Sequence, residues 1–287
     1  MEGKRRAKGG SWLKVQGSWR KRFRRFFFPG AGPLLETAAL FLPAIPAYLW
    51  LWPNVTGAAH SIAEGLANVY AMGVVLFVGL RRWNLDQLGL NDRGFFFSLT
   101  CGLVLIAGRT LLLLSIDWGV PAPHFGFSRI LGEIFFDFML VGVGQELLFR
   151  GLIYRALQDW IGVGWAIIGS SLAFGLWHVF GQGPLIGAAT AFYGLVFALV
   201  RWRTGSIIGL ICVHGLLDYA TALILPETVN VVSVRPAIPH PLWLALGLAL
   251  IVLVPIYIWK IHPLAERAFP AMALFGRRPA SPTQQPH

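Results

Sequence analysis

The sequence has little charge, few acidic residues and almost no cysteine. Charged residues make up only 13% of its 287 positions, whereas a soluble domain carries about 25%, which argues against a water-soluble globular protein. The two cysteines, Cys101 and Cys212, lie far apart in apolar segments. We therefore expect free, buried thiols and neither a disulfide framework nor a cysteine metal cluster.

In place of charge, the chain has long apolar runs. Hydrophobic residues make up 56% of the sequence and fall into runs of about 20, the length that a helix needs to cross a bilayer. The runs lack the alternation of apolar and polar residues that marks a membrane barrel. The sequence therefore predicts an all-α, polytopic membrane helical bundle with about eight transmembrane helices. Their predicted ranges are 33–52, 60–80, 96–115, 128–150, 163–180, 186–201, 206–225 and 242–261.

Basic residues set the predicted orientation of the chain. Ten of the 24 Lys and Arg residues lie between Lys4 and Arg25, and the second, fourth and sixth connectors also carry arginine. The first, third and fifth connectors carry no basic residue, and the seventh has only Arg235. By the positive-inside rule, this alternation puts both termini on the cytoplasmic side.

The chain divides into three predicted regions. Residues 1–30 interleave basic and aromatic side chains, so we expect a cytoplasmic segment that binds anionic headgroups and not nucleic acid. Residues 31–265 form the predicted transmembrane domain, and residues 266–287 a disordered cytoplasmic tail. Compact connectors without an organelle-type targeting signal favour a bacterial inner membrane.

The first polar motif inside a span contains Gln145, Glu146 and Arg150, at the predicted cytoplasmic end of the fourth span. Ionisable side chains are expensive in a membrane, so they indicate a function or a paired structural role. Glu146 and Arg150 are four positions apart and can pair on one helix face. Taken alone, the motif is also explained by an ion pair at the membrane boundary, with Arg150 reaching the headgroups.

Two further motifs each contribute a histidine. His178 lies in the fifth span, and His214 lies in the seventh with Asp218 four positions later, where the carboxylate can orient the imidazole. Each histidine alone is explained by a hydrogen bond between helices. Together with Glu146 they match the needs of water activation, in which one group accepts a proton from water and another stabilises an oxyanion.

The order and spacing of these motifs resemble those of the CPBP family of intramembrane glutamic endopeptidases, which includes CAAX prenyl protease type II and the Abi proteins. The family pattern is EExxxR, then FxxxH, then HxxxN or HxxxD on three helices. This chain has QExxxR at 145–150, FxxxH at 174–178 and HxxxD at 214–218. The resemblance covers roughly residues 80–225 and implies an α-helical membrane protease.

The resemblance implies a metal-independent endopeptidase that needs no cofactor and cleaves a membrane-anchored or lipidated peptide. In this family pattern His178 works with the general base, His214 and Asp218 form the oxyanion hole, and Arg150 holds Glu146 in place. A metal-dependent hydrolase using the same acidic and histidine side chains ranks lower, because no HExxH-type pair is present. A transporter ranks lower still, because no matching pair of interrupted helices is found.

Gln145 departs from the family pattern, which has a glutamate at this position. A glutamine amide has no useful basicity near neutral pH, so Gln145 cannot be the general base. Three explanations stay open. Glu146 acts as the base, although neighbouring helix positions point about 100° apart; the chain is a catalytically disarmed pseudo-peptidase or a binding or immunity protein; or a glutamate was replaced deliberately.

Three more ionisable residues lie inside predicted spans. Arg109 is in the third span, and Glu133 and Asp137 lie four positions apart in the fourth. We predict that the two carboxylates neutralise Arg109 across a helix pair.

Overall fold

The computed structural model describes residues 31–44, 46, 54, 58–115, 131, 132, 134–224 and 241–261. Within these residues every regular element is a helix and none is a strand, so the predicted all-α class is confirmed. The basic segment 1–30, the tail 266–287 and Glu133 lie outside the described residues, and what the sequence predicts for them stays a prediction.

The helices follow one another along the chain, and the η elements are π-helical. In order they are α2 (Ala31–Phe41), α4 (Ala58–Gly79), α5 (Phe95–Ser115), η1 (Phe135–Gly142), α7 (Val143–Glu146), η2 (Leu147–Ile153), α8 (Tyr154–Ile161), α9 (Val163–Gln182), α10 (Pro184–Thr204), α11 (Ile208–Ile224), α12 (Pro241–Ile256) and η3 (Tyr257–Ile261). Each predicted span overlaps one of these elements or an unbroken series of them.

Five segments of the described residues are long and apolar enough to cross a bilayer. They are Ile62–Gly79, Phe95–Leu113, Val163–Gln182, Pro184–Thr204 and Pro241–Lys260. They make this a multi-pass membrane protein. The apolar helices at the first and seventh predicted spans are shorter, and the fourth is interrupted by π-helical segments. The total of eight spans and their orientation therefore remain predictions.

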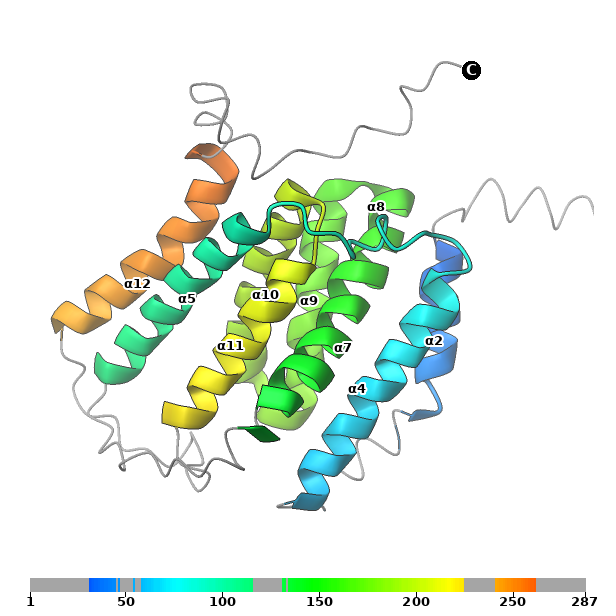
Figure 1. Cartoon of the computed structure of the whole chain (residues 1–287), viewed down its shortest axis with the longest axis horizontal. Coiled ribbons are helices and arrows are strands. Elements are labelled where there is room, and N and C mark those ends of the chain that lie inside the picture. The colour runs from blue at the N-terminus through cyan, green and yellow to red at the C-terminus, as the bar shows by residue number, and fades with distance from the viewer. Residues whose placement is uncertain are drawn as a thin grey trace, which may run out of the picture.

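The bundle has two edges and a centre (Figure 1). Helices α5 and α12 pack together at one edge and α2 packs on α4 at the other, with α7, α9, α10 and α11 between them. The connector from α4 to α5, helix α8 and the turn between α10 and α11 all lie at one end of the bundle, as do the start of α2 and the end of η3. Among the residues that the structure describes, these polar connectors lie at the same end.

The helix that contains the fourth predicted span continues beyond residue 150. The helix continues through η1, α7, η2 and α8 to Ile161, and the chain reverses at Gly162, where φ is +92°. The polar residues of α8 looked like a connector, but Arg155 and Asp159 pair along one helix face at 3.0 Å, while Tyr154 and Ala156 are buried. The first polar motif therefore lies inside a helix and not at its end.

Small residues let α9 and α10 approach closely. A Cβ atom built on Gly175 would lie 2.6 Å from the carbonyl oxygen of Gly187, and one on Gly187 would lie 3.0 Å from the carbonyl oxygen of Gly175. Such small-residue contacts are how membrane helices reach good packing without a hydrophobic driving force. The contact fixes the part of α9 that carries Phe174 and His178.

Candidate active site

Gln145, Glu146 and Arg150 lie in the most deeply buried part of the bundle. Their exposed fractions are 3%, 0% and 0%. Glu146 ends the short helix α7 and Arg150 lies in the π-helical segment η2 that follows. The interpretation of Arg150 as a residue that reaches the headgroups is therefore wrong, because the helix continues past it and neighbouring helices cover it. Wide π-helical turns occur frequently at functional sites.

The Glu146 carboxylate connects two helices. Its Oε1 atom accepts a hydrogen bond from Arg150 Nη1 at 2.9 Å, and His214 Nδ1 on α11 lies 2.8 Å from the same oxygen. The pairing with Arg150 is the one that the i,i+4 spacing predicts. The contact with His214 joins residues 68 positions apart in the sequence, and the spacing alone gave no sign of it.

His214 lies between two carboxylates. Its Nδ1 faces Glu146, and its Nε2 lies 3.4 Å from Asp218 Oδ2. A carboxylate oxygen only accepts hydrogen bonds, so the geometry suits a ring that carries a proton on both nitrogens. The rings of Phe174 and Phe197 meet the imidazole edge-on, with centroids 5.7 and 5.8 Å away. Asp218 and Glu146 therefore both orient the His214 ring.

His178 has a different hydrogen-bond setting. Its Nδ1 lies 2.9 Å from the carbonyl oxygen of Phe174, and because a carbonyl only accepts, Nδ1 carries the proton. In the neutral ring Nε2 then has a free lone pair, which is what a proton acceptor needs. The ring centre of Phe174 lies 4.6 Å from that of His178 and 5.7 Å from that of His214. The three motifs, predicted to converge from separate spans, therefore do lie together.

Aromatic rings surround the buried guanidinium of Arg150. Its Cζ atom lies 4.2 Å from the ring centre of Phe174, 5.3 Å from that of Phe197 and 6.0 Å from that of Phe149. These contacts add cation–π attraction to the ion pair with Glu146. They favour a planar, delocalised cation over the compact ammonium of lysine.

The Gln145 amide lies beside this network without joining it. Gln145 Oε1 has no hydrogen-bond partner among the described residues. A neutral amide can both donate to and accept from a water molecule or a peptide group, although it cannot take up a proton at neutral pH. Within the described residues, no group of three or more His, Cys, Asp and Glu side chains is arranged to hold a metal ion.

Glu64 on α4 was not among the predicted site residues. The charge of this carboxylate interacts with that of Asp218. One turn further on, buried Asn68 packs against Gly144, where an added Cβ would lie 3.2 Å from Asn68 Oδ1. Helix α4 therefore borders the site. The signal was available, because Glu64 is a carboxylate within an apolar run, but no motif included it.

Arg201 was also misread. We counted it among the basic connector residues that set orientation, but only 5% of its surface is exposed. Its Nε donates to the carbonyl oxygen of Arg150 at 3.3 Å, and its Nη2 donates to that of Gln87 at 2.9 Å. The sequence position of a basic residue near a helix end does not show whether its side chain points into the bundle or toward solvent.

Arg109 faces helix α11. Its Nη1 donates to the carbonyl oxygen of Leu217 at 3.3 Å. Asp137 is buried in η1, and the predicted partner Glu133 lies outside the described residues. Neutralisation of Arg109 by this carboxylate pair stays a prediction.

Comparison with known proteins supports the family resemblance. Residues 127–220 match the family model described as type II CAAX prenyl endopeptidase Rce1-like. The match covers a third of the chain and includes all three motifs, whereas Glu64 and the connector after α4 lie outside it. No match was found among curated proteins or among solved structures. The resemblance inferred from the motifs is therefore confirmed: over residues 127–220 this chain is similar to the Rce1-like type II CAAX prenyl endopeptidases.

Proposed function

We propose that this protein is an intramembrane endopeptidase that hydrolyses a peptide bond in a membrane-anchored or lipidated peptide. The observation that carries the proposal is the contrast between its two histidines. His178 keeps an unprotonated Nε2 in its neutral form, because Nδ1 donates to Phe174. His214 has a carboxylate oxygen facing each ring nitrogen. One histidine is set to accept a proton and the other to stabilise negative charge.

In the proposed reaction the Nε2 atom of His178 takes a proton from water as the water oxygen bonds to the scissile carbonyl carbon. His214, held by Glu146 through Nδ1, donates its Nε2–H to the oxyanion of the tetrahedral intermediate in place of the 3.4 Å contact with Asp218. The intermediate then collapses, the carbon–nitrogen bond breaks, and His178 returns its proton to the leaving amine. Gln145 orients the water through its amide.

Glu146 has a supporting role in this proposal. Its Oε1 atom already receives Arg150 and lies at hydrogen-bond distance from His214. A carboxylate that took up the water proton would weaken both contacts at the moment the oxyanion forms. The glutamate of the predicted Glu/His site therefore acts through His214, and His178 is the base.

The proposal extends to the membrane arrangement. Eight crossings with both termini cytoplasmic agree with the gathering of polar connectors at one end of the bundle (Figure 1). That end would then face the cytoplasm of a bacterial cell, where the basic segment 1–30 binds anionic headgroups.

The test is cleavage of prenylated and acylated peptides in detergent micelles by the purified chain. We expect cleavage that falls by about 10²-fold or more in His178→Ala, while Trp165→Ala, an exposed residue of the same helix, leaves the rate unchanged. If EDTA leaves the rate intact, the metal-dependent alternative is removed. Equal cleavage by the parent chain and His178→Ala would overturn the assignment of the base.

The second candidate is a disarmed relative that binds a membrane peptide without cutting it. Gln145 is the observation that favours this candidate, since the family pattern has a glutamate there. Gln145→Glu distinguishes the two: cleavage by Gln145→Glu alone means that the site is intact but lacks its base. Peptide binding without cleavage by either protein would support the binding role.

A further inference from the structure

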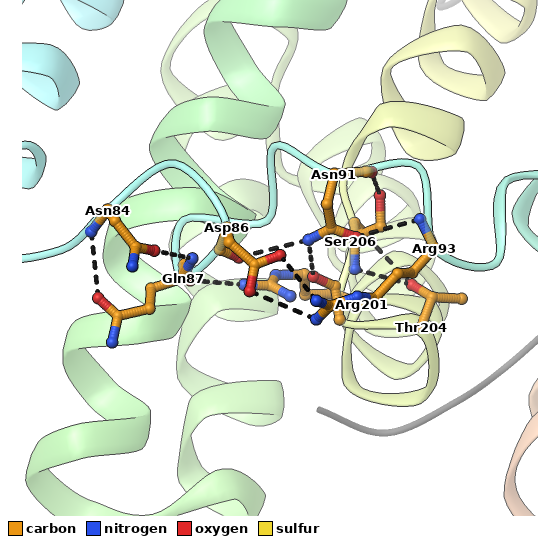
Figure 2. Close-up of polar contacts among 9 residues, drawn as sticks. Asn84, Asp86, Gln87, Asn91, Arg93, Arg201, Thr204 and Ser206 are labelled. Carbon is orange, nitrogen blue, oxygen red and sulfur yellow. Dashed lines mark hydrogen bonds and ion pairs between the residues drawn. The ribbon is translucent and has the colours of Figure 1, made fainter. Parts of the chain in front are cut away.

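The connector between α4 and α5 is held against the bundle by a network of polar contacts (Figure 2). Asn91 Nδ2 donates to the carbonyl oxygen of Gly205 at 3.0 Å, and Ser206 Oγ donates to the carbonyl oxygen of Asn91. The backbone N–H of Ile207 donates to the carbonyl oxygen of Gly89 at 2.8 Å. These bonds fix the connector on the turn between α10 and α11.

Arg201 is the member of this network that points toward the site. It lies in the last turn of α10 and donates to two main-chain carbonyls from different parts of the chain, those of Gln87 and Arg150. Its Cζ atom also lies 5.7 Å from the ring centre of Tyr154. The guanidinium fork thus connects the connector to the helix that carries the first motif.

The Arg150 carbonyl is free to accept this bond because the helix is widened there. In a regular α-helix the N–H of Tyr154 would donate to the carbonyl of Arg150, four residues back. Here the N–H of Tyr154 donates to the carbonyl of Phe149, five residues back, as in a π-helix. Arg201 supplies a donor at the position where the ordinary helix bond is missing.

The connector leaves room for the guanidinium only because it has a glycine at the crossing point. Gly89 has φ +91°, and a Cβ added to it would lie 2.8 Å from Arg201 Cζ. Any side chain at this position meets both backbone strain and the buried cation. Position 89 therefore gives a second way to displace Arg201 without changing it.

We propose that Arg201 is a positioning residue for peptide cleavage, which holds the widened turn of η2 so that Arg150 and Glu146 keep His214 in place. The path is continuous: Arg201 binds the main chain of Arg150, the Arg150 side chain binds Glu146, and Glu146 faces His214. The proposal rests on the proposed function, since it assigns a role in that reaction.

Three variants test it with one control. Arg201→Ala removes both donors, Arg201→Lys keeps the charge with a donor that has no fork, and Gly89→Ala displaces the guanidinium. The control is Arg93→Ala, which removes a largely exposed ion pair with Asp86 from the same connector. Each protein is purified as the full chain, and its thermal unfolding is followed alongside its kinetics.

We expect kcat to fall about 10²-fold in Arg201→Ala and in Gly89→Ala, with KM within about twofold of the parent, because a displaced catalytic group slows the chemical step. Arg201→Lys should recover part of the rate, since an ammonium can reach one of the two carbonyls. Arg93→Ala should match the parent. The proposal would be overturned if Arg201→Ala left kcat unchanged, or if it raised KM without lowering kcat.

A second measurement separates this proposal from the proposed function. The ¹⁵N chemical shifts of the His214 ring, assigned by comparison with His214→Gln, report the contact with Glu146 whether or not a peptide is cut. We expect them to move in Arg201→Ala and Gly89→Ala but not in Arg93→Ala. If the parent cleaves nothing while these shifts move, the function fails and the positioning role stands. If they stay fixed, the positioning role fails.

Discussion

Arg150 and Arg201 are buried arginines on neighbouring helices, and their guanidinium groups have different hydrogen-bond partners. Arg150 has an anionic partner, Glu146, and three aromatic faces. The hydrogen bonds of Arg201 go instead to uncharged carbonyls of Gln87 and of Arg150 itself. The first arrangement contains groups that can exchange protons, whereas the hydrogen bonds of the second go to main-chain dipoles. The comparison separates a region suited to chemistry from one suited to holding that chemistry in place.

The largest expected effect comes from breaking the buried ion pair. Arg150→Met leaves the Glu146 carboxylate buried without its cation, and such a loss typically destabilises a protein by about 3–5 kcal/mol. Arg201→Met leaves two carbonyls without a donor and should destabilise by about 1–3 kcal/mol. Reversible unfolding in mixed micelles measures both.

A matched control for Arg150→Met is Arg82→Met. Arg82 pairs with Glu36 at 2.6 Å, but both side chains are partly exposed, so we expect a loss of about 0–1 kcal/mol. The hydrogen bond from Arg82 to Glu36 also raises the pKa of Arg82 above its ordinary value. Equal losses for Arg150→Met and Arg82→Met would remove the distinction between a buried and an exposed pair.

A smaller effect should follow from loosening the connector. Asn91→Ala removes the side-chain bonds to the carbonyls of Gly205 and Asp86, and we expect about 1–2 kcal/mol of destabilisation. Amide hydrogen exchange should rise in the connector and in the turn after α10, while α9 keeps its protection. Faster exchange across the whole bundle would instead mean that the connector is part of one cooperative core.

The sequence was sufficient to predict the motif-bearing helices and their convergence. Periodic spacing showed that Glu146 and Arg150 share a face, and polar residues inside apolar spans singled out His178, His214 and Asp218, to which the family pattern then gave roles. What failed depended on three-dimensional context. The polar residues of α8 looked like a connector, so the continuation of the helix from residue 150 to Ile161 was not predicted.

The sequence also failed to predict which side chains point into the bundle. Arg201 and Arg155 both looked like connector residues, yet Arg201 points into the bundle while Arg155 pairs with Asp159 on a partly exposed helix face. Glu64 was passed over because its role depends on where α4 packs against α7, which no spacing within α4 reveals. Sequence periodicity shows which residues share a helix face, whereas only the packed structure shows which helix that face contacts.

The smallest expected effect concerns Glu64, and its sign is the informative part. Glu64 is partly buried, and its charge is repelled by that of Asp218. Glu64→Gln removes this repulsion and should therefore stabilise the protein, by less than about 1 kcal/mol. In an Asp218→Asn background the gain should shrink, because the repelling partner is already neutral. Glu36→Gln should have the opposite sign, since Glu36 loses its bonds to Arg82. Additive effects of Glu64→Gln and Asp218→Asn in unfolding experiments would place Glu64 outside the site, and α4 would then be a scaffold helix only.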